Sequence, residues 1–206
     1  YLAEPSEDEG NPFGIQAIAA CVRDLSTRRA VAFGVDLAKT VDFTVVVGLD
    51  SNRVVSEFRR FQAPWPDTRD RIMGAVGTRR ALVDATGVGD PIMDDLVRLR
   101  HGRYEPYKFS APKKQQLMEG LAVAIQSGTV RFPDGPIRLE LESFEYEYKE
   151  RGRVYYSAPS GSHDDCVVAL GLAVKLFNDN RSLMGADRPD TADVGGYQQA
   201  EVPVMW

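Results

Sequence analysis

Four aspartates carry the strongest chemical signal in this sequence. Asp36 lies near the end of the apolar run VAFGVDL, Asp84 ends the segment RRALVD, and Asp164 and Asp165 begin the apolar segment HDDCVVALGLAVKLF. Carboxylates that gather closely repel one another and raise each other's pKa values, so a cluster of them is favourable mainly when cations lie between them. Oxygen ligands of this type suit Mg²⁺ or Mn²⁺. Two such ions about 4 Å apart would activate a water on one side of a phosphodiester and stabilise the leaving 3′-oxygen on the other.

Each aspartate also has a purely structural interpretation. An aspartate at the end of a strand is often a turn former, which applies to both Asp36 and Asp84. Asp84 could instead cap the helix expected after Gly89. One of Asp164 and Asp165 is expected to serve as a helix N-cap, a position that the helix macrodipole favours for an acid. The catalytic interpretation depends on the conjunction of three acidic strand or helix ends, in an order that allows them to converge.

The residue patterns of the segments around these acids predict a mixed α/β sheet. Three β-branched or alternating segments joined by short connections indicate an antiparallel meander, and the later strands alternate with helical patterns. Strands are expected at 30–37, 42–50, 52–61, 79–87 and 104–109, helices at 66–77, 89–101, 110–128, 137–148 and 163–177, and a hairpin at 149–158. This order predicts three antiparallel strands followed by parallel strands, with helices on both faces.

The expected topology suggests where two of the acids lie. If the strands at 30–37 and 79–87 are neighbours, Asp36 and Asp84 project from the same end of the sheet, where α/β folds place their sites. The start of the last helix beside them would add Asp164 and Asp165.

Length and composition indicate one globular domain with tails. The chain has 206 residues, of which 43% are hydrophobic, enough to bury a core. All of the strong periodicity falls within residues 29–178, which we interpret as the domain. Residues 1–28 combine an acidic, turn-rich stretch with one short helix, and residues 179–206 are expected to be loosely ordered. The chain begins at Tyr1 rather than Met, which suggests a fragment of something longer.

Net charge, cysteine content and hydropathy indicate how the protein binds nucleic acid and in which compartment it works. A net charge of -5 disfavours tight standalone binding to a polyanion unless metal ions or a partner supply positive charge. Cys21 and Cys166 form no metal-ligand or disulfide pattern, which favours a reducing compartment. No signal peptide and no apolar run long enough to span a bilayer is present, so we expect a soluble intracellular protein that does not enter a membrane.

Three of these segments together resemble a known family. The stretches FGVDLAKTVDFTVV, RALVDATGVGDPIMDDL and SGSHDDCVVALGLAVKL are similar to the nuclease domain of tailed-phage large terminases, an RNase H-like fold, over about residues 29–178. The resemblance implies that Asp36, Asp84 and Asp165 are catalytic metal ligands and that Asp164 is a further ligand or a substitute. It also implies that YLAEPSEDEGNPFG is the connector after an ATPase domain. The chain itself contains no G-x-x-x-x-G-K-[ST] loop, so that ATPase domain is missing from it.

Other polar residues have weaker functional interpretations. Asp42 could order a metal-bound water, although a turn residue explains it at least as well. His163 could orient the scissile phosphate or act as a ligand, although a loop histidine beside a helix cap is more often structural. Six basic residues could contact a DNA backbone, although each could equally be an ordinary solvated surface residue. These residues are Lys39 near Asp36, Lys108, Lys113 and Lys114 around the start of the helix at 110–128, and Arg151 and Arg153 at the tip of the expected hairpin.

The leading hypothesis is a metal-dependent endonuclease that cuts double-stranded viral DNA with little sequence preference during genome packaging. Asp36 would bridge two Mg²⁺ or Mn²⁺ ions, with Asp84 and Asp165 holding one each. The portal and the small terminase subunit are the expected partners, at the procapsid portal in the host cytoplasm. The alternatives are a resolvase- or transposase-type nuclease of the same fold, a module that binds DNA or the portal without cutting, and a fragment of an actin-like ATPase.

Overall fold

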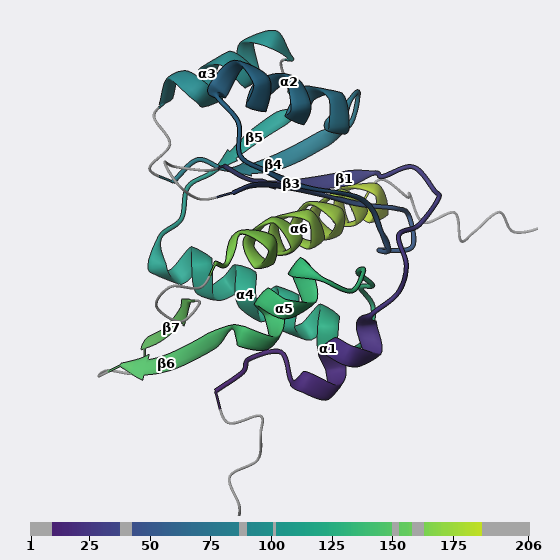
Figure 1. Cartoon of the computed structure of the whole chain (residues 1–206), viewed down its shortest axis with the longest axis vertical. Helices are drawn as coiled ribbons and strands as arrows, with labels where there is room; N and C mark the ends of the chain where they lie inside the picture. Colours follow the sequence, from purple (N-terminus) through teal and green to yellow (C-terminus); the bar gives the residue numbers. More distant parts are fainter. Residues whose placement is uncertain are drawn as a thin grey trace, which may run out of the picture.

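The computed structural model describes residues 10–37, 43–86, 90–100, 102–149, 153–157 and 163–186 (Figure 1). These residues form a five-stranded sheet with helices on both faces, and a separate two-stranded hairpin. In this part of the chain, no helix combines the length and the apolar character that crossing a bilayer requires.

The sheet is mixed, with strand order β3-β2-β1-β4-β5. β1 (Ala32–Asp36), β2 (Thr44–Leu49) and β3 (Val55–Phe61) form an antiparallel meander. β4 (Arg80–Asp84) runs parallel to β1, and β5 (Tyr104–Tyr107) runs parallel to β4. All residues of β1 and β2 are buried, because these central strands are covered on both faces. The predicted order of three antiparallel strands followed by parallel strands is therefore confirmed.

The helices lie in layers on the two faces of the sheet (Figure 1). α2 (Trp65–Val76) and α3 (Asp90–Leu99) cover one face, and α6 (Asp165–Ala186) packs on the other. A further layer beyond α6 holds α1 (Ile15–Cys21), α4 (Ala111–Gln126) and α5 (Pro136–Ser143). Two apolar cores result, the larger one around α6 and the smaller one beneath α2 and α3.

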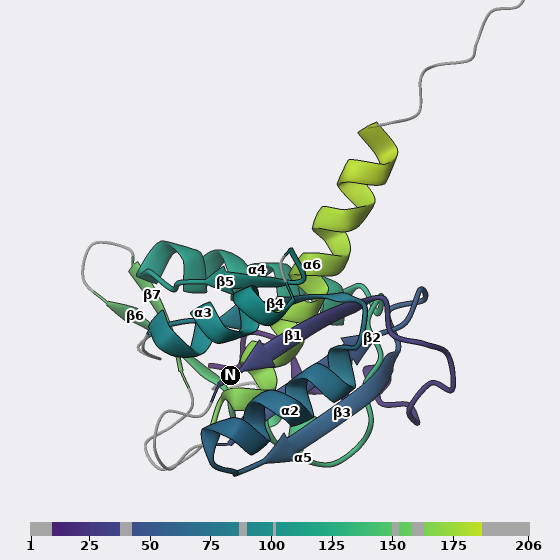
Figure 2. The same ribbon diagram turned by 90° about the horizontal axis from the view of Figure 1, so that it is seen from above.

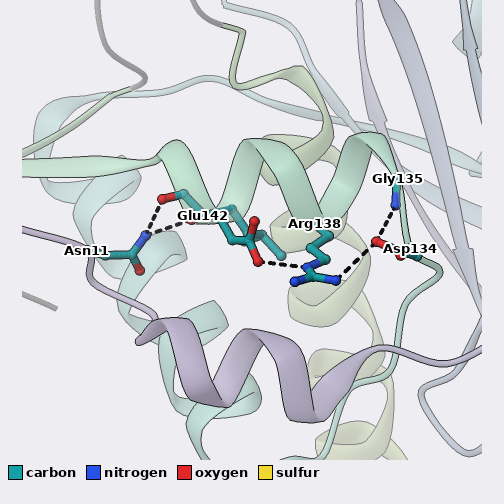
Figure 3. A network of polar contacts seen from close by, with 6 residues as sticks. Asn11, Asp134, Gly135, Arg138 and Glu142 are labelled. Carbon is teal, nitrogen blue, oxygen red and sulfur yellow. Dashed lines mark hydrogen bonds and ion pairs between the residues drawn. The ribbon is translucent and has the colours of Figure 1, made fainter. Parts of the chain in front are cut away.

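The end of α5 corrects one prediction. The periodic pattern predicted a helix over 137–148, yet α5 ends at Ser143 because Phe144 adopts an extended backbone, with φ −75° and ψ 135°. The Nδ2 amide of Asn11 donates to the carbonyl oxygens at this end of the helix, including that of Glu142 at 3.1 Å (Figure 3). The N-terminal segment thus satisfies carbonyl groups that a longer helix would have bonded internally.

The residues after α5 form the predicted hairpin, but it begins earlier than expected. β6 (Glu145–Lys149) pairs antiparallel with β7 (Arg153–Ser157) in a sheet of its own. The strand sequence EYEYK alternates an acid with a tyrosine, which suits an extended segment better than a helix.

The last helix is longer than the sequence indicated. α6 continues to Ala186, past residue 178 where the domain was expected to end, and its final turns project from the body of the molecule (Figure 2). The boundaries at residues 28 and 178 stay predictions. Residues 1–9 and 187–206 lie outside the described residues.

Gly34 in β1 allows the backbone of α6 to pack directly against the backbone of the strand. A Cβ atom at Gly34 would lie 2.5 Å from the amide nitrogen of Ala173 and even closer to the carbonyl oxygen of Ala169. Such separations are incompatible with any side chain, so the helix and the central strand can keep this position only with glycine here.

A buried aspartate organises the turn between β2 and β3. Asp50 is 1% exposed, and its Oδ1 accepts hydrogen bonds from the amides of Asn52 at 2.8 Å and Val54 at 2.9 Å. Its Oδ2 accepts a hydrogen bond from the Ser26 hydroxyl at 2.7 Å. Burial raises the pKa of Asp50, but these hydrogen bonds to the charged form outweigh it, so the net pKa is below its ordinary value.

We predict that Gly34→Ala lowers the free energy of unfolding by about 1–3 kcal/mol or more, because α6 must move off β1 to admit the methyl group. Urea denaturation followed by circular dichroism measures this change. The control is Gly120→Ala in α4, where no atom lies within 4 Å of the added Cβ and where we expect a gain of about 0.4–1 kcal/mol. Equal stability of Gly34→Ala and wild type would contradict the close approach.

We predict that Asp50→Asn lowers the free energy of unfolding by about 1–3 kcal/mol at neutral pH, because hydrogen bonds to a carboxylate become hydrogen bonds to a neutral amide. Since the folded-state pKa is lowered, this contribution is present above the unfolded pKa of about 4 and is lost as the pH falls through the folded pKa. Denaturation curves of both proteins between neutral pH and pH 3 test this. A stability difference that does not shrink on acidification would count against it.

Candidate active site

Four aspartates from three elements line one pocket. The pocket has a volume of about 260 Å³, and its walls include Asp36, Asp84, Asp164 and Asp165. Leu37, Thr86, Phe109, Lys114 and Val168 complete it. The structure therefore brings together the four acids that the sequence singled out, while their roles stay predictions.

The parallel pairing of β1 and β4 explains how two of the acids meet. Val35 pairs with Val83 in the register of these strands, and each strand ends at the following residue, Asp36 or Asp84. Asp36 is 9% exposed and Asp84 is 8% exposed. Both carboxylates thus lie at the carboxyl end of the sheet, mostly shielded from solvent.

Thr86 holds Asp84 in place. The Thr86 amide donates to Asp84 Oδ1 at 2.7 Å, which forms a local turn closed by the aspartate side chain. The hydroxyl oxygen of Thr86 accepts a hydrogen bond from the Phe109 amide at 2.7 Å. The segment after β4 is thereby tied to the segment after β5, and the Asp84 carboxylate is fixed at the pocket wall.

The two acids at the start of α6 differ in their surroundings: Asp165 is the first residue of the helix, and Asp164 directly precedes it. The carbonyl oxygen of Asp164 accepts the Val168 amide at 2.9 Å, so the helical hydrogen bonds begin there. Asp165 is 8% exposed, and its Oδ2 accepts a hydrogen bond from the Phe43 amide at 3.3 Å. The Asp164 side chain is 30% exposed and forms an ion pair with Lys114, with 2.9 Å between Nζ and Oδ2. Asp165 is thus the more enclosed of the two carboxylates.

His163 lies beside Asp165. Its Nδ1 is 3.6 Å from Asp165 Oδ2, and its ring meets the ring of Phe43 edge to face, with centroids 5.6 Å apart. The histidine is therefore packed between Asp165 and the Phe43 ring.

The candidate DNA-contacting residues fall into three groups. Lys114 lines the pocket, whereas Lys108 and Lys113 are exposed at the edge of the same region, before and at the start of α4. The Nζ of Lys113 lies 5.6 Å from the centroid of the Tyr107 ring. Arg153 belongs to β7, but its side chain is not described. Lys39, Asp42 and Arg151 lie outside the described residues.

Sequence reasoning missed Glu140, a buried acid next to the site. Glu140 is 8% exposed, and its Oε2 accepts a hydrogen bond from the Cys166 amide at 2.7 Å. Burial raises the pKa of Glu140, while the Cys166 hydrogen bonds and the charge of Arg60 lower it in part. The available signal was the position of this acid on the apolar face of α5, between Ile137 and Leu141.

The cysteines take no part in the site chemistry. Cys21 and Cys166 are both free and buried. Burial raises the pKa of each thiol, which keeps the sulfur protonated and unreactive.

The residues of the pocket fit a hard divalent cation. Carboxylate oxygens from three elements suit ions that retain several waters and take their other ligands from a substrate. Among the described residues, no three or more histidine, cysteine, aspartate or glutamate side chains lie close enough together to hold a metal ion by themselves. An open arrangement of this kind is compatible with a site completed by water and by a phosphate substrate.

Comparisons with known proteins show that the chain is similar to large terminase subunits and their nuclease domains. No family model matches the chain. The large terminase subunit of Thermus virus P23-45 is 30% identical over 173 residues, which cover 81% of this chain and 36% of the relative. The chain thus spans about a third of the length of the curated relatives it matches.

A solved structure has a similar fold. The crystal structure of the large terminase nuclease from the thermophilic phage G20c superposes with a TM-score of 0.68 at 25% identity, and the match covers 81% of this chain and 98% of that one. The chain is homologous to phage large terminase nuclease domains.

A further structural neighbour bears on the metal. The same G20c nuclease with bound magnesium has a TM-score of 0.69 and 25% identity, with 81% of this chain and 97% of that one covered. The resemblance drawn from the sequence is therefore confirmed, and so is the RNase H-like mixed sheet. The G20c nuclease therefore binds a divalent metal ion in its crystal structure.

Proposed function

We propose that this chain is the endonuclease domain of a phage large terminase and that it cleaves double-stranded viral DNA during genome packaging. The observation that carries the proposal is the convergence of Asp36, Asp84 and Asp165, from β1, β4 and α6, on one pocket. A site of enclosed carboxylates is costly to the folded protein unless cations occupy it. Its position at the carboxyl ends of parallel strands is where α/β folds carry their chemistry.

In this proposal, Asp36, Asp84 and Asp165 hold two divalent cations, Mg²⁺ or Mn²⁺, and Asp164 is a further ligand. When bound, the ions would activate the attacking water and stabilise the leaving 3′-oxygen of the phosphodiester. The three carboxylates are at most 9% exposed, so most of their contact with bulk water is already lost before the ions bind. The Thr86 amide keeps Asp84 oriented, and the Phe43 amide does the same for Asp165.

Lys114 has a separate role in this proposal. Its ammonium group pairs with Asp164 at the edge of the pocket, where it offsets part of the negative charge. Together with the exposed Lys108 and Lys113, it would contact the phosphates that flank the cut. Contacts of this kind carry no base information, which accounts for cleavage with little sequence preference and for strong sensitivity to salt.

Partners would supply what this domain lacks. With a net charge of -5, the domain alone should bind DNA weakly. We infer that an ATPase domain, the small terminase subunit and the portal hold DNA at the site. The setting would be the procapsid portal in the host cytoplasm. A module that docks DNA without cutting is the rival interpretation, but a binding surface for DNA gains nothing from clustered carboxylates.

We predict that the wild-type domain nicks and linearises plasmid with Mn²⁺ or Mg²⁺ and leaves it intact with EDTA. Asp36→Asn should lower the cleavage rate by about a hundredfold or more, because a neutral amide is a poor ligand for a hard cation. Asp70→Asn, on the exposed face of α2, is the matched control and should cleave as wild type does. If plasmid survives every metal condition while the domain still shifts DNA on a gel, the non-cleaving module is the better description.

We further predict that Asp165→Asn impairs cleavage more than Asp164→Asn does. Asp165 is 8% exposed in the pocket, whereas the Asp164 side chain is 30% exposed and already paired with Lys114. Initial cleavage rates at saturating Mn²⁺, with circular dichroism as a check of folding, decide the order. Equal losses would mean that both acids hold metal, and the reverse order would make Asp164 the principal ligand.

A further inference from the structure

The buried carboxylate of Glu140 contacts the first turn of α6 from a neighbouring helix. Its Oε2 accepts a hydrogen bond from the Cys166 amide at 2.7 Å, and Cys166 directly follows Asp165. The first amides of a helix have no partner within the helix, and the positive end of the macrodipole favours an acid there. Glu140 in α5 therefore acts as a cap for α6 from outside that helix.

A second chain of contacts runs from Glu140 to the carboxylate of Asp165. The Nη2 atom of Arg60 lies 3.7 Å from Glu140 Oε1, and the guanidinium carbon lies 3.6 Å from the centroid of the Phe43 ring. The Phe43 amide donates to Asp165 Oδ2 at 3.3 Å. Asp165 is thus held through its backbone by Glu140 and through its side chain by Phe43, and Arg60 joins the two supports.

We propose that Glu140 is a positioning residue for the metal site, which fixes the first turn of α6 and hence the direction of the Asp165 carboxylate. The inference depends on the proposed function, since it assigns Glu140 to the same site. Glu140 is not among the residues that line the pocket, so it acts through Asp165 rather than on substrate. Groups that orient metal ligands in this way strongly affect metal affinity.

Two substitutions separate the length of the Glu140 side chain, which is its reach to the Cys166 amide, from its charge. Glu140→Gln keeps the length of the side chain and an oxygen that can accept the Cys166 hydrogen bond, but removes the charge beside Arg60. Glu140→Asp keeps the charge but withdraws the carboxylate from the Cys166 amide by one methylene group. A positioning role requires the reach, whereas a purely electrostatic role requires the charge.

The experiment compares both variants with wild type by titrating Mn²⁺ into the protein and following free Mn²⁺ by electron paramagnetic resonance. Plasmid cleavage as a function of Mn²⁺ then gives the maximal rate and the half-saturating concentration separately, and thermal melts check folding. Glu142→Gln and Glu142→Asp are matched controls, since Glu142 lies on the same helix and pairs with Arg138 on the surface (Figure 3).

We expect Glu140→Asp to weaken Mn²⁺ binding by about tenfold and to raise the half-saturating Mn²⁺ concentration equally, with the maximal rate recovered at high Mn²⁺. Glu140→Gln and both controls should bind as wild type does. Wild-type affinity in Glu140→Asp, or a loss confined to Glu140→Gln, would overturn the positioning role. Wild type that binds Mn²⁺ without cutting would overturn the proposed function alone, and wild type that binds no Mn²⁺ would overturn both proposals.

Discussion

The close packing of α6 on β1 is the constraint on which the geometry of the site depends. Gly34 admits the helix backbone at Ala169 and Ala173, and Ala169 lies one helical turn after Asp165. Gly34 itself is two residues before Asp36. The two carboxylates are therefore placed by the crossing of two rigid elements close to their ends, and the hydrogen-bonded register of β1 with β4 adds Asp84. The backbone positions of Asp36, Asp84 and Asp165 are thus determined by the packing of the core, and residues of the connecting segments, Thr86 and Phe43, then orient two of the carboxylates.

This arrangement brings several negatively charged carboxylates together where little solvent reaches them. Nearby hydrogen-bond donors reduce the repulsion between these carboxylates. Lys114 pairs with Asp164, and backbone amides bind Asp84 and Asp165. These contacts reduce the repulsion among the carboxylates without filling the pocket, because each donor approaches from the wall. A bound cation would relieve the remaining repulsion, so binding would stabilise the fold as well as enable chemistry. On the proposed function, the stability of the domain would therefore rise with the concentration of the cation.

The sequence predicted the sheet well because its strands carry strong local signals. The apolar runs that became β1 and β2 and the short strand ending at Asp84 could be placed by pattern alone, and their acidic ends pointed to the site. The end of α5 could not be placed in this way, since it depends on Asn11, more than a hundred residues away in the chain. The burial difference between Asp164 and Asp165 likewise arises from tertiary partners, Phe43 and Lys114, that spacing does not reveal. Lys39 and Asp42 lie outside the described residues, so their assignments stay predictions.

Glu140 illustrates why a buried polar side chain can persist in a core that an apolar residue would fill at lower cost. Burial raises its pKa, which means that the folded protein disfavours its ionised form. Replacing a buried ion pair with well-packed apolar groups is often neutral or stabilising, so the Glu140 and Arg60 pair is weak as an argument for stability. An apolar side chain, however, cannot accept the Cys166 amide, and the start of α6 would then lose the contact that fixes it from α5. The acid is better explained by the need to hold one helix end in one position, and that helix end carries Asp165.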